Sequence, residues 1–485
     1  MKSISTLIIL ACCFTSCSKW LDVQPQSEVS QDVLFSTQEG FEEALNGIYS
    51  RCSQSDSYGR DITCGFLDVL AQNYTLPARD ESRYKQTSLY NYNDKDFINR
   101  KDNAWKALYN GIANSNLILE HIEGKQQLFA GTKFSLIKGE AFALRAYFHF
   151  DALRMFAPSY VSDANAKGIP YVTTFSKSVI AFSTVAQVLD SVIGDLKRAK
   201  ELLSVSDPIL SPGYKVGYAQ KDSSTETTGE LFLQHRRHRM NYYAVCGELA
   251  RVYLYKGDKA NALINAEEVI NANKFPWTMQ NSFLNPDDEK KDRILYKELI
   301  FAFYVPNRRD DLNGLFRNGT SSLTIKTTEG QTIYEVGGVG GDDFRFKQWL
   351  SLQTESADTY LRLEKYKRDG DANLHDLMAP AIRLSEIYYI AAECTFDLNP
   401  QKAWDYFNTV RLNRGIGTAL SDPLKETFLS ELVKESRKEF YGEGQIFYMY
   451  KRLNRAVIGP SGVTYAPVNS IFVLPLPDDE IQFGK

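Results

Sequence analysis

The sequence lacks the short motifs that mark most families of enzymes. It has no HExxH zinc motif, no GxSxG nucleophile elbow and no phosphate-binding P-loop. The glycines at 337–341 are followed by no lysine, so they do not indicate a phosphate cradle. Only five histidines are present, and the one close pair, His235 and His238, has no third metal ligand nearby in the sequence. We therefore predict no catalytic residue, no metal and no cofactor.

Excess charge and long apolar runs are also missing. The net charge is −4, with no long run of one sign, which argues against nucleic acid as a partner because phosphate binding needs a basic surface. The short basic run 236–239 is expected to be a solvated helix start. The apolar stretch 4–14 is too short to span a bilayer, which takes about 20 residues.

The N-terminus instead predicts export and lipid anchoring. Lys2 precedes the apolar stretch, as in a secretory signal, which we place at residues 1–16. No A-x-A cleavage site follows, but Phe14-Thr15-Ser16-Cys17 looks like a bacterial lipobox, which makes Cys17 the predicted lipidation site. Cys12 is a rival site that would leave a shorter apolar segment. Residues 17–36 are then a lipidated start and tether.

Most of the remaining chain has the periodicity of amphipathic helices. Helices are predicted at residues 37–49, 102–123, 139–157, 184–203, 241–256, 259–271, 379–396, 401–414 and 425–441. Two apolar stripes in 139–157 indicate a helix sandwiched between others. Small residues alternate with aromatics around the turn Gly257-Asp258, as in tetratricopeptide hairpins. The prediction is a mainly α fold, a scaffold of tetratricopeptide-like helical hairpins with large loop-rich insertions and minor β hairpins.

Two insertions interrupt the helices and are the expected places for ligand binding. They span residues 51–97 and 274–378, and the second contains a predicted strand at 299–305 and a hairpin of 323–327 with 332–336. Sugar rings stack on exposed aromatic faces while their hydroxyls need polar partners. The predicted ligand-binding residues are Tyr74, Arg79, Asp80, Tyr84, Tyr90, Tyr92, Trp277 and Trp349.

Carboxylates and cysteines leave two further expectations. Glu386 and Glu393 are the sharpest candidates for a glycosidase pair, but Arg383 precedes Glu386 by one turn, which favours a structural ion pair on a helix. Cys52 and Cys64 lie close in sequence, so a disulfide between them is open outside the cytoplasm.

Several segments, in order along the chain, resemble the SusD/RagB family over nearly the whole mature length. They are Cys17-Ser18-Lys19-Trp20-Leu21-Asp22, Trp105 with Tyr109 and Asn116, Gly139-Glu140-Ala141 with Leu144-Arg145-Ala146-Tyr147-Phe148, Gly168-Ile169-Pro170-Tyr171, Glu439-Phe440 with Gly442-Glu443-Gly444-Gln445, and Leu474-Pro475-Leu476-Pro477. The resemblance divides one compact domain into an N-terminal helical region, 37–272, and a C-terminal region, 273–485.

The resemblance also implies a role. Such a protein is a non-catalytic lipoprotein of the outer membrane that faces the cell exterior. It captures a glycan and lids a SusC-like TonB-dependent barrel transporter. A peptide ligand is the alternative within the same uptake system, and a surface glycoside hydrolase is a further one. The loop near residues 68–73 departs from the family's Ser-Asp-Glu-like pattern, so starch is not implied as the ligand.

Overall fold

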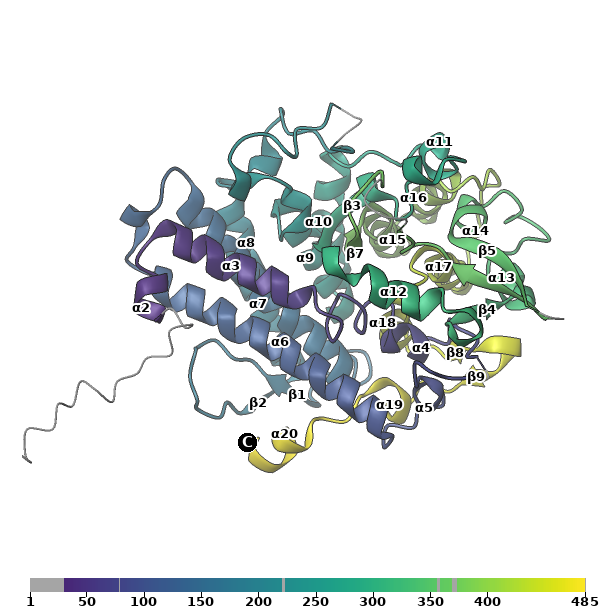
Figure 1. Ribbon diagram of the computed structural model, residues 1–485, viewed down its shortest axis with the longest axis horizontal. Coiled ribbons are helices and arrows are strands. Elements are labelled where there is room, and N and C mark those ends of the chain that lie inside the picture. Colours follow the sequence, from purple (N-terminus) through teal and green to yellow (C-terminus); the bar gives the residue numbers. More distant parts are fainter. Residues whose placement is uncertain (1–29, 78, 220–222, 356–357, 369–372, 485) are drawn as a thin grey trace, which may run out of the picture.

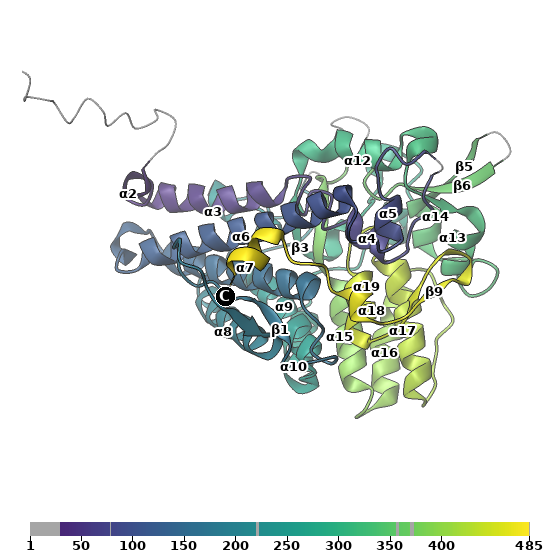
Figure 2. The ribbon, with the colours of Figure 1, turned by 90° about the horizontal axis from the view of Figure 1, so that it is seen from below.

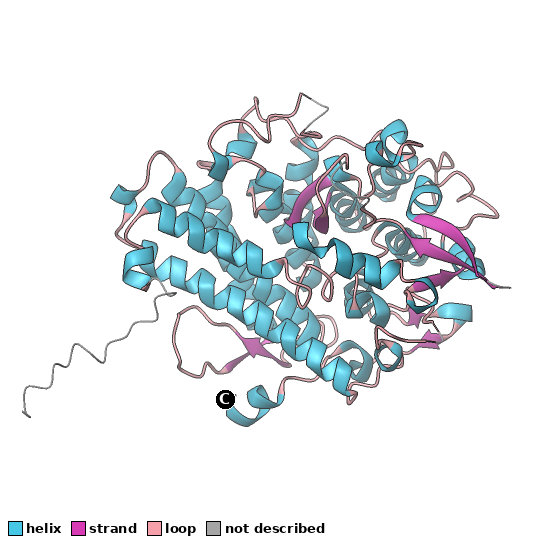
Figure 3. Cartoon of the chain, in the orientation of Figure 1, coloured by secondary structure: helices cyan, strands magenta, loops and turns pink. Residues whose placement is uncertain are grey.

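The computed structural model describes residues 30–77, 79–219, 223–355, 358–368 and 373–484 (Figure 1). The predicted signal segment 1–16 and the lipidation site Cys17 lie outside these residues. Helices dominate the described chain, and the strands form small separate sheets (Figure 3). The predicted fold class is confirmed.

The long helices stack so that each contacts the next along the chain. In order they are α3 (Gln38–Cys52), α6 (Lys95–Ile122), α7 (Lys133–Phe156), α8 (Val185–Ser204), α9 (Tyr242–Lys256), α10 (Lys259–Asn271), α15 (Leu384–Thr395) and α16 (Pro400–Leu412). Figures 1 and 2 show the helices of the N-terminal half on one side of the molecule and α15 and α16 on the other. This neighbour-to-neighbour order is that of a tetratricopeptide-type stack.

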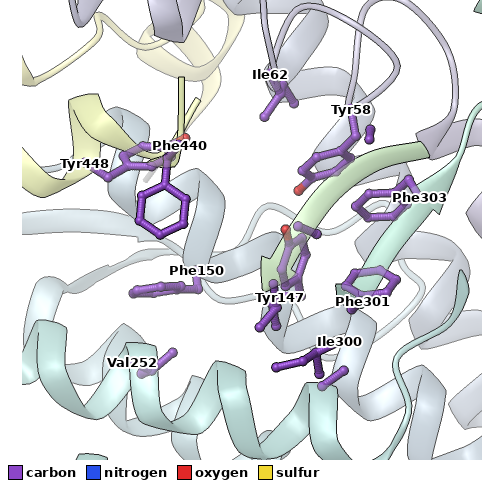
Figure 4. Close-up of a cluster of buried hydrophobic side chains, with 14 of the residues drawn as sticks. Tyr58, Ile62, Tyr147, Phe150, Val252, Ile300, Phe301, Phe303, Phe440 and Tyr448 are labelled. Carbon is purple, nitrogen blue, oxygen red and sulfur yellow. The ribbon is translucent and has the colours of Figure 1, made fainter. Parts of the chain in front are cut away.

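Helix α7 is buried on nearly all sides, as its two apolar stripes predict. It packs between α6 and α8. Gly111 of α6 permits this approach, because a methyl group at that position would lie 2.6 Å from the ring of Phe148. Aromatic side chains of α7 continue the core toward the first insertion, where Tyr58 stacks on Phe303 at 4.3 Å between ring centroids (Figure 4).

Local capping explains where several helices begin and end. Asp258 caps α10 by accepting from the Asn261 amide, and Gly257 ends α9 in the left-handed conformation, so the hairpin lies where the sequence predicts it. Helix α6 starts earlier than predicted, at Lys95, because the Asp94 carboxylate accepts from the amides of Asp96 and Phe97.

The other helices join or flank this stack. They are α2 (Gln31–Leu34), α4 (Phe66–Leu70), α5 (Lys85–Ser88), α11 (Gln280–Phe283), α12 (Arg309–Phe316), α13 (Thr327–Ile333), α14 (Phe344–Trp349), α17 (Lys425–Glu439), α18 (Ile446–Leu453), α19 (Asn469–Phe472) and α20 (Asp478–Phe483). Helices α17 and α18 pack on each other, and α17 also contacts α15. No helix among the described residues combines the length and apolar character that crossing a bilayer requires.

The second insertion contains two sheets. Strand β3 (Leu299–Tyr304) pairs antiparallel with β7 (Met378–Arg383), and Tyr304 lies opposite Met378. Strands β4 (Thr324–Lys326), β6 (Asp358–Leu363) and β5 (Leu350–Glu355) form the other sheet in that order. Two smaller pairs are β1 (Lys167–Pro170) with β2 (Phe182–Thr184), and β8 (Val457–Ile458) with β9 (Thr464–Tyr465).

Two secondary-structure predictions are wrong. Residues 332–336 form no strand, because α13 covers Thr327–Ile333. Strand β4 pairs instead with β6, which also pairs with β5. The predicted helix 379–396 begins as strand β7 and becomes α15 only at Leu384. A short, fully buried apolar run does not show by its periodicity whether it is strand or helix.

The structure answers the open question of the two cysteines and contradicts the prediction for the basic run. Cys52 and Cys64 are buried and free, each packed within the core, so no disulfide joins them. Arg236 and Arg237 are buried rather than solvated, because Arg236 pairs with Asp207 at 2.9 Å and Arg237 pairs with Glu226 at 2.6 Å. The run forms a single 3₁₀ turn, Arg236–His238, instead of a helix start.

Candidate ligand-binding site

The predicted residues of the first insertion mainly hold that insertion in place. Tyr74 and Tyr84 are buried, and their hydroxyls donate to Asp68 at 3.0 Å and Asp61 at 3.3 Å. The exposure expected for these two rings is not found, because each ring fills the core beside its carboxylate. Asp80 accepts from the backbone amides of Tyr84 and Lys85 at 3.0 and 2.7 Å, which fixes the start of α5.

The other three residues of this insertion lie nearer the surface. Tyr90 and Tyr92 are half-buried, and their hydroxyls donate to the backbone carbonyls of Leu70 and Ile471. Arg79 is exposed and pairs with Glu81 at 2.8 Å.

The two predicted tryptophans also have structural partners. Trp349 is buried, its indole donates to the Arg293 carbonyl at 2.8 Å, and the Lys365 ammonium lies 3.7 Å from its ring centroid. Its expected exposure is therefore not found. Trp277 is half-buried and packs against Tyr388 with 5.2 Å between ring centroids.

The eight residues do not converge on one cavity. A different cavity, of about 340 Å³, has the mixture of aromatic and polar side chains that sugar binding needs. We call it the Tyr304 cavity. Its lining comprises Asn46, Tyr49, Ser50, Ser53, Gln54, Leu231, Gln234, His235, His238, Arg239, Tyr304, Pro306 and Asn307.

Three segments distant in sequence build this cavity: the end of α3 with the turn after it, the 3₁₀ turn at Arg236–His238, and the end of β3. Tyr304 is the last residue of β3 and its only exposed one, with 44% of the side chain accessible. Its ring stacks on His238 at 5.4 Å, and His238 stacks on His235 at 4.7 Å between centroids. The wall is therefore a short series of parallel rings.

Arg239 supplies an oriented positive charge on the same wall. Its guanidinium donates to Asn46 at 2.7 Å and pairs with Glu140 at 3.0 Å, and the Tyr49 hydroxyl also donates to Glu140 at 2.7 Å. Burial alone raises the pKa of Glu140, but Arg236 and Arg239 outweigh it and hold the pKa below its usual value. Glu140 therefore stays ionised and keeps Arg239 in place.

The larger cavity elsewhere has a different character. It measures about 730 Å³ and its walls are mainly apolar, with Tyr109, Ile112, Phe175 and Val179 among them. Phe175 is 44% exposed, like Tyr304, but fewer polar groups surround it. The Tyr304 cavity suits a hydroxyl-rich ligand better.

The candidate glycosidase pair is held in ion pairs. Glu386 pairs with Arg251 at 2.7 Å and Glu393 pairs with Arg452 at 2.7 Å, beside a cavity of about 80 Å³. The predicted structural role of the two carboxylates agrees with this geometry, but the predicted partner is wrong. Arg383 ends β7 and pairs with Glu439 and Glu443.

The two histidines of the cavity wall gain a neighbour that the sequence does not suggest. Asp376 brings a carboxylate oxygen to them, and one ligand atom from each of the three side chains lies within 4.8 Å of the others. The local sequence shows no such third residue, because only the fold brings Asp376 beside the two histidines.

The sequence signal for the Tyr304 cavity is weak. Tyr304 ends a buried apolar strand and looks like one more core residue, and Arg239 looks like part of a solvated basic run. The structure distinguishes Tyr304 from the rest of its strand, because the five residues before it are buried and Tyr304 is exposed.

The fold and the cavity define a class, a tetratricopeptide-type protein with an open pocket that is lined by the helical scaffold and by both insertions. Family models agree with this class. One described as "Starch-binding associating with outer membrane" matches residues 19–220, and one described as "SusD family" matches residues 319–468.

Individual relatives cover nearly the whole chain. The SusD-like protein P38 of Formosa agariphila is 27% identical over 521 aligned residues, covering 95% of this chain and 94% of its own. The crystal structure of a putative sugar binding protein from Bacteroides vulgatus is similar with a TM-score of 0.71 at 24% identity, covering 92% of this chain and 97% of its own. Surface glycan-binding protein A from Bacteroides thetaiotaomicron, solved with laminarihexaose, has a TM-score of 0.64 at 16% identity, covering 92% and 98%. The chain belongs to the SusD/RagB family.

Proposed function

We propose that this protein is a non-catalytic glycan-binding protein of the outer-membrane surface, and that the Tyr304 cavity holds the oligosaccharide. The single observation that carries the proposal is the exposed Tyr304 ring beside oriented polar groups. Family membership supports carbohydrate binding, as do relatives described as sugar-binding or glycan-binding.

The cavity chemistry matches the two faces of a sugar. The apolar C–H face of a pyranose ring stacks on an aromatic ring such as Tyr304. Its hydroxyls both donate and accept, and the wall offers the guanidinium of Arg239 with the amides of Asn46 and Asn307. An oligosaccharide can therefore be bound there without any catalytic group.

The proposal includes a place in an uptake system. A lipid on Cys17 would hold the protein at the outer membrane, and the protein would lid a SusC-like TonB-dependent barrel and pass the captured glycan to it. Support comes from the family description, which associates its members with the outer membrane, and from the lipobox-like sequence before Cys17.

Isothermal titration of the mature chain against panels of oligosaccharides and peptides tests this function. We expect binding to at least one glycan and none to the peptides. Tyr304→Ala should weaken that binding on the order of ten- to a hundredfold, because loss of one stacking contact costs about 1–3 kcal/mol by analogy with bases on aromatics.

Phe175→Ala is the matched control, since Phe175 is equally exposed but lies in the larger apolar cavity. It should leave affinity unchanged. If Phe175→Ala abolishes binding while Tyr304→Ala does not, the site is in the other cavity. Binding to peptides alone, or turnover of a glycan detected by mass spectrometry, would overturn the proposed function.

A further inference from the structure

A 3₁₀ turn places two imidazoles over one another in the wall of the Tyr304 cavity. A 3₁₀ helix has three residues per turn, so side chains at i and i+3 eclipse. His235 caps this turn and His238 ends it, and their rings are nearly parallel, with 16° between the planes. The buried Nδ1 atom of His235 has no hydrogen-bond partner among the described residues.

Strand pairing brings a carboxylate to the same point. Met378 lies opposite Tyr304 in the β3–β7 pair, and the Val305 amide donates to the Leu377 carbonyl at 3.0 Å. Asp376, one residue further back, therefore lies beside the end of β3, where Tyr304 stacks on His238. One ligand atom from each of His235, His238 and Asp376 lies within 4.8 Å of the other two.

Carboxylates pair with the two arginines that lie beside these three residues. Arg237 and Arg239 flank the histidines, but Arg237 pairs with Glu226 at 2.6 Å and Arg239 with Glu140 at 3.0 Å.

We propose that His235, His238 and Asp376 bind one zinc ion at the edge of the Tyr304 cavity. Two imidazoles with one carboxylate form a known zinc ligand set, and zinc takes these donors at about 2.0–2.2 Å. Donors around a tetrahedral ion then lie about 3.4 Å from each other, so side-chain rotations that shorten the observed spacing by up to about 1.4 Å complete the site. The Tyr296 hydroxyl, 3.4 Å from Nε2 of His238, helps to orient that ring.

Three protein ligands leave the ion an open coordination position. Tetrahedral zinc takes four ligands, and sites with three protein donors keep water or a ligand oxygen in the fourth position. Because His235 and His238 line the cavity, a glycan oxygen there is a suitable fourth ligand. This goes beyond glycan binding, which needs no metal.

Competition between the mature protein and a colorimetric zinc chelator tests the site. Protein stripped of metal should take up one equivalent of Zn²⁺, at least tenfold more tightly than Ca²⁺, which prefers oxygen ligands. Asp376→Asn and His235→Ala should each weaken zinc binding at least tenfold. Asp342→Asn is the control, because Asp342 is an exposed carboxylate that pairs with Lys347 and is not part of the candidate site. This variant should bind zinc like the wild type.

Cobalt provides a second reading that does not depend on affinity alone. Co²⁺ bound in the site should give visible absorption bands of a low-coordinate ion, and Asp376→Asn should remove them. Zinc uptake that Asp376→Asn and His235→Ala leave unchanged, or no saturable uptake at all, would refute the site. Melting temperatures without metal verify that the variants are folded. Glycan titration of the metal-free wild type tests the proposed function separately. Asp376→Asn should bind glycan like the metal-free wild type, because Asp376 does not line the cavity.

Discussion

Glu435 and Glu439 of α17 lie in a network of buried charges beneath the C-terminal helices. Arg345 pairs with both, at 2.8 and 3.0 Å, and Glu439 also pairs with Arg383 at 2.5 Å and with Arg414 at 2.8 Å. Burial of these groups is costly, and the pairing offsets that cost. Removal of one partner should therefore be far more damaging than at the surface.

Glu435→Gln makes this prediction measurable. Burial alone raises the pKa of Glu435, but Arg345 and Lys438 outweigh it and lower the pKa to about 2. A lowered folded-state pKa stabilises the protein above the unfolded value of about 4.3, and the effect is lost as pH falls toward 2. The variant should lose about 3–5 kcal/mol at pH 7 in urea unfolding, and the difference from wild type should shrink below pH 4.5.

The control lies on the same helix. Glu431 pairs with Lys434 at 2.7 Å, with half of the lysine side chain exposed, so Glu431→Gln should cost less than about 1 kcal/mol. A pH-independent deficit in Glu435→Gln would show that lost packing, and not lost charge pairing, causes the effect.

At the scale of elements, helix ends depend on single residues. Gly257 ends α9 at a φ of 83°, a conformation that costs other residues about 1–2 kcal/mol. Gly194 lies within α8, and a methyl group there meets no atom within 4 Å. The two glycines therefore have opposite consequences for stability.

Gly257→Ala should destabilise the protein by about 1 kcal/mol, whereas Gly194→Ala should stabilise it by about 0.5–1 kcal/mol, because alanine restricts the unfolded chain and favours helix. Thermal unfolding of both variants beside wild type measures this. A decrease of similar size in both would mean that the added methyl group, and not the backbone conformation, decides the outcome.

Elements with local signals could be predicted from the sequence. Helix α10 begins and ends as predicted because its cap and turn are adjacent residues. The start of α6 was missed because the Asp94 cap lies in what looks like a loop, and β7 because its partner β3 is some 80 residues away by position.

The cavity was beyond sequence reasoning for the same reason. Its wall joins Asn46, His238 and Tyr304, which only the tertiary fold brings together. Tyr74 and Trp349, predicted as ligand-binding aromatics of the insertions, lie in the core. Aromatic content within an insertion does not separate a ring that packs from one that binds.

At the scale of the whole molecule, one stack of helices carries both insertions. The first insertion joins α3 to α6 and the second joins α10 to α15, so each connects helices that are neighbours in the stack. The end of α3 and the end of β3 can thus meet at the Tyr304 cavity while the scaffold stays continuous. The lipid anchor that we propose lies before α2, outside the described residues.

Cys17 is the residue on which we expect that anchoring to depend. Cys17→Ala should abolish palmitate labelling, because the lipid is carried by this cysteine and a stable anchor needs more than one acyl chain. Cys12→Ala is the matched control, since Cys12 is the rival site in the same apolar segment, and it should remain labelled. Palmitate labelling identifies the lipidated cysteine more directly than membrane fractionation does, because an uncleaved precursor can stay on the membrane through its apolar segment. Label lost only from Cys12→Ala would move the anchor to Cys12, and label retained by both variants would place the lipid on another residue. No label in the wild type would remove the lipid anchor from the proposed uptake system.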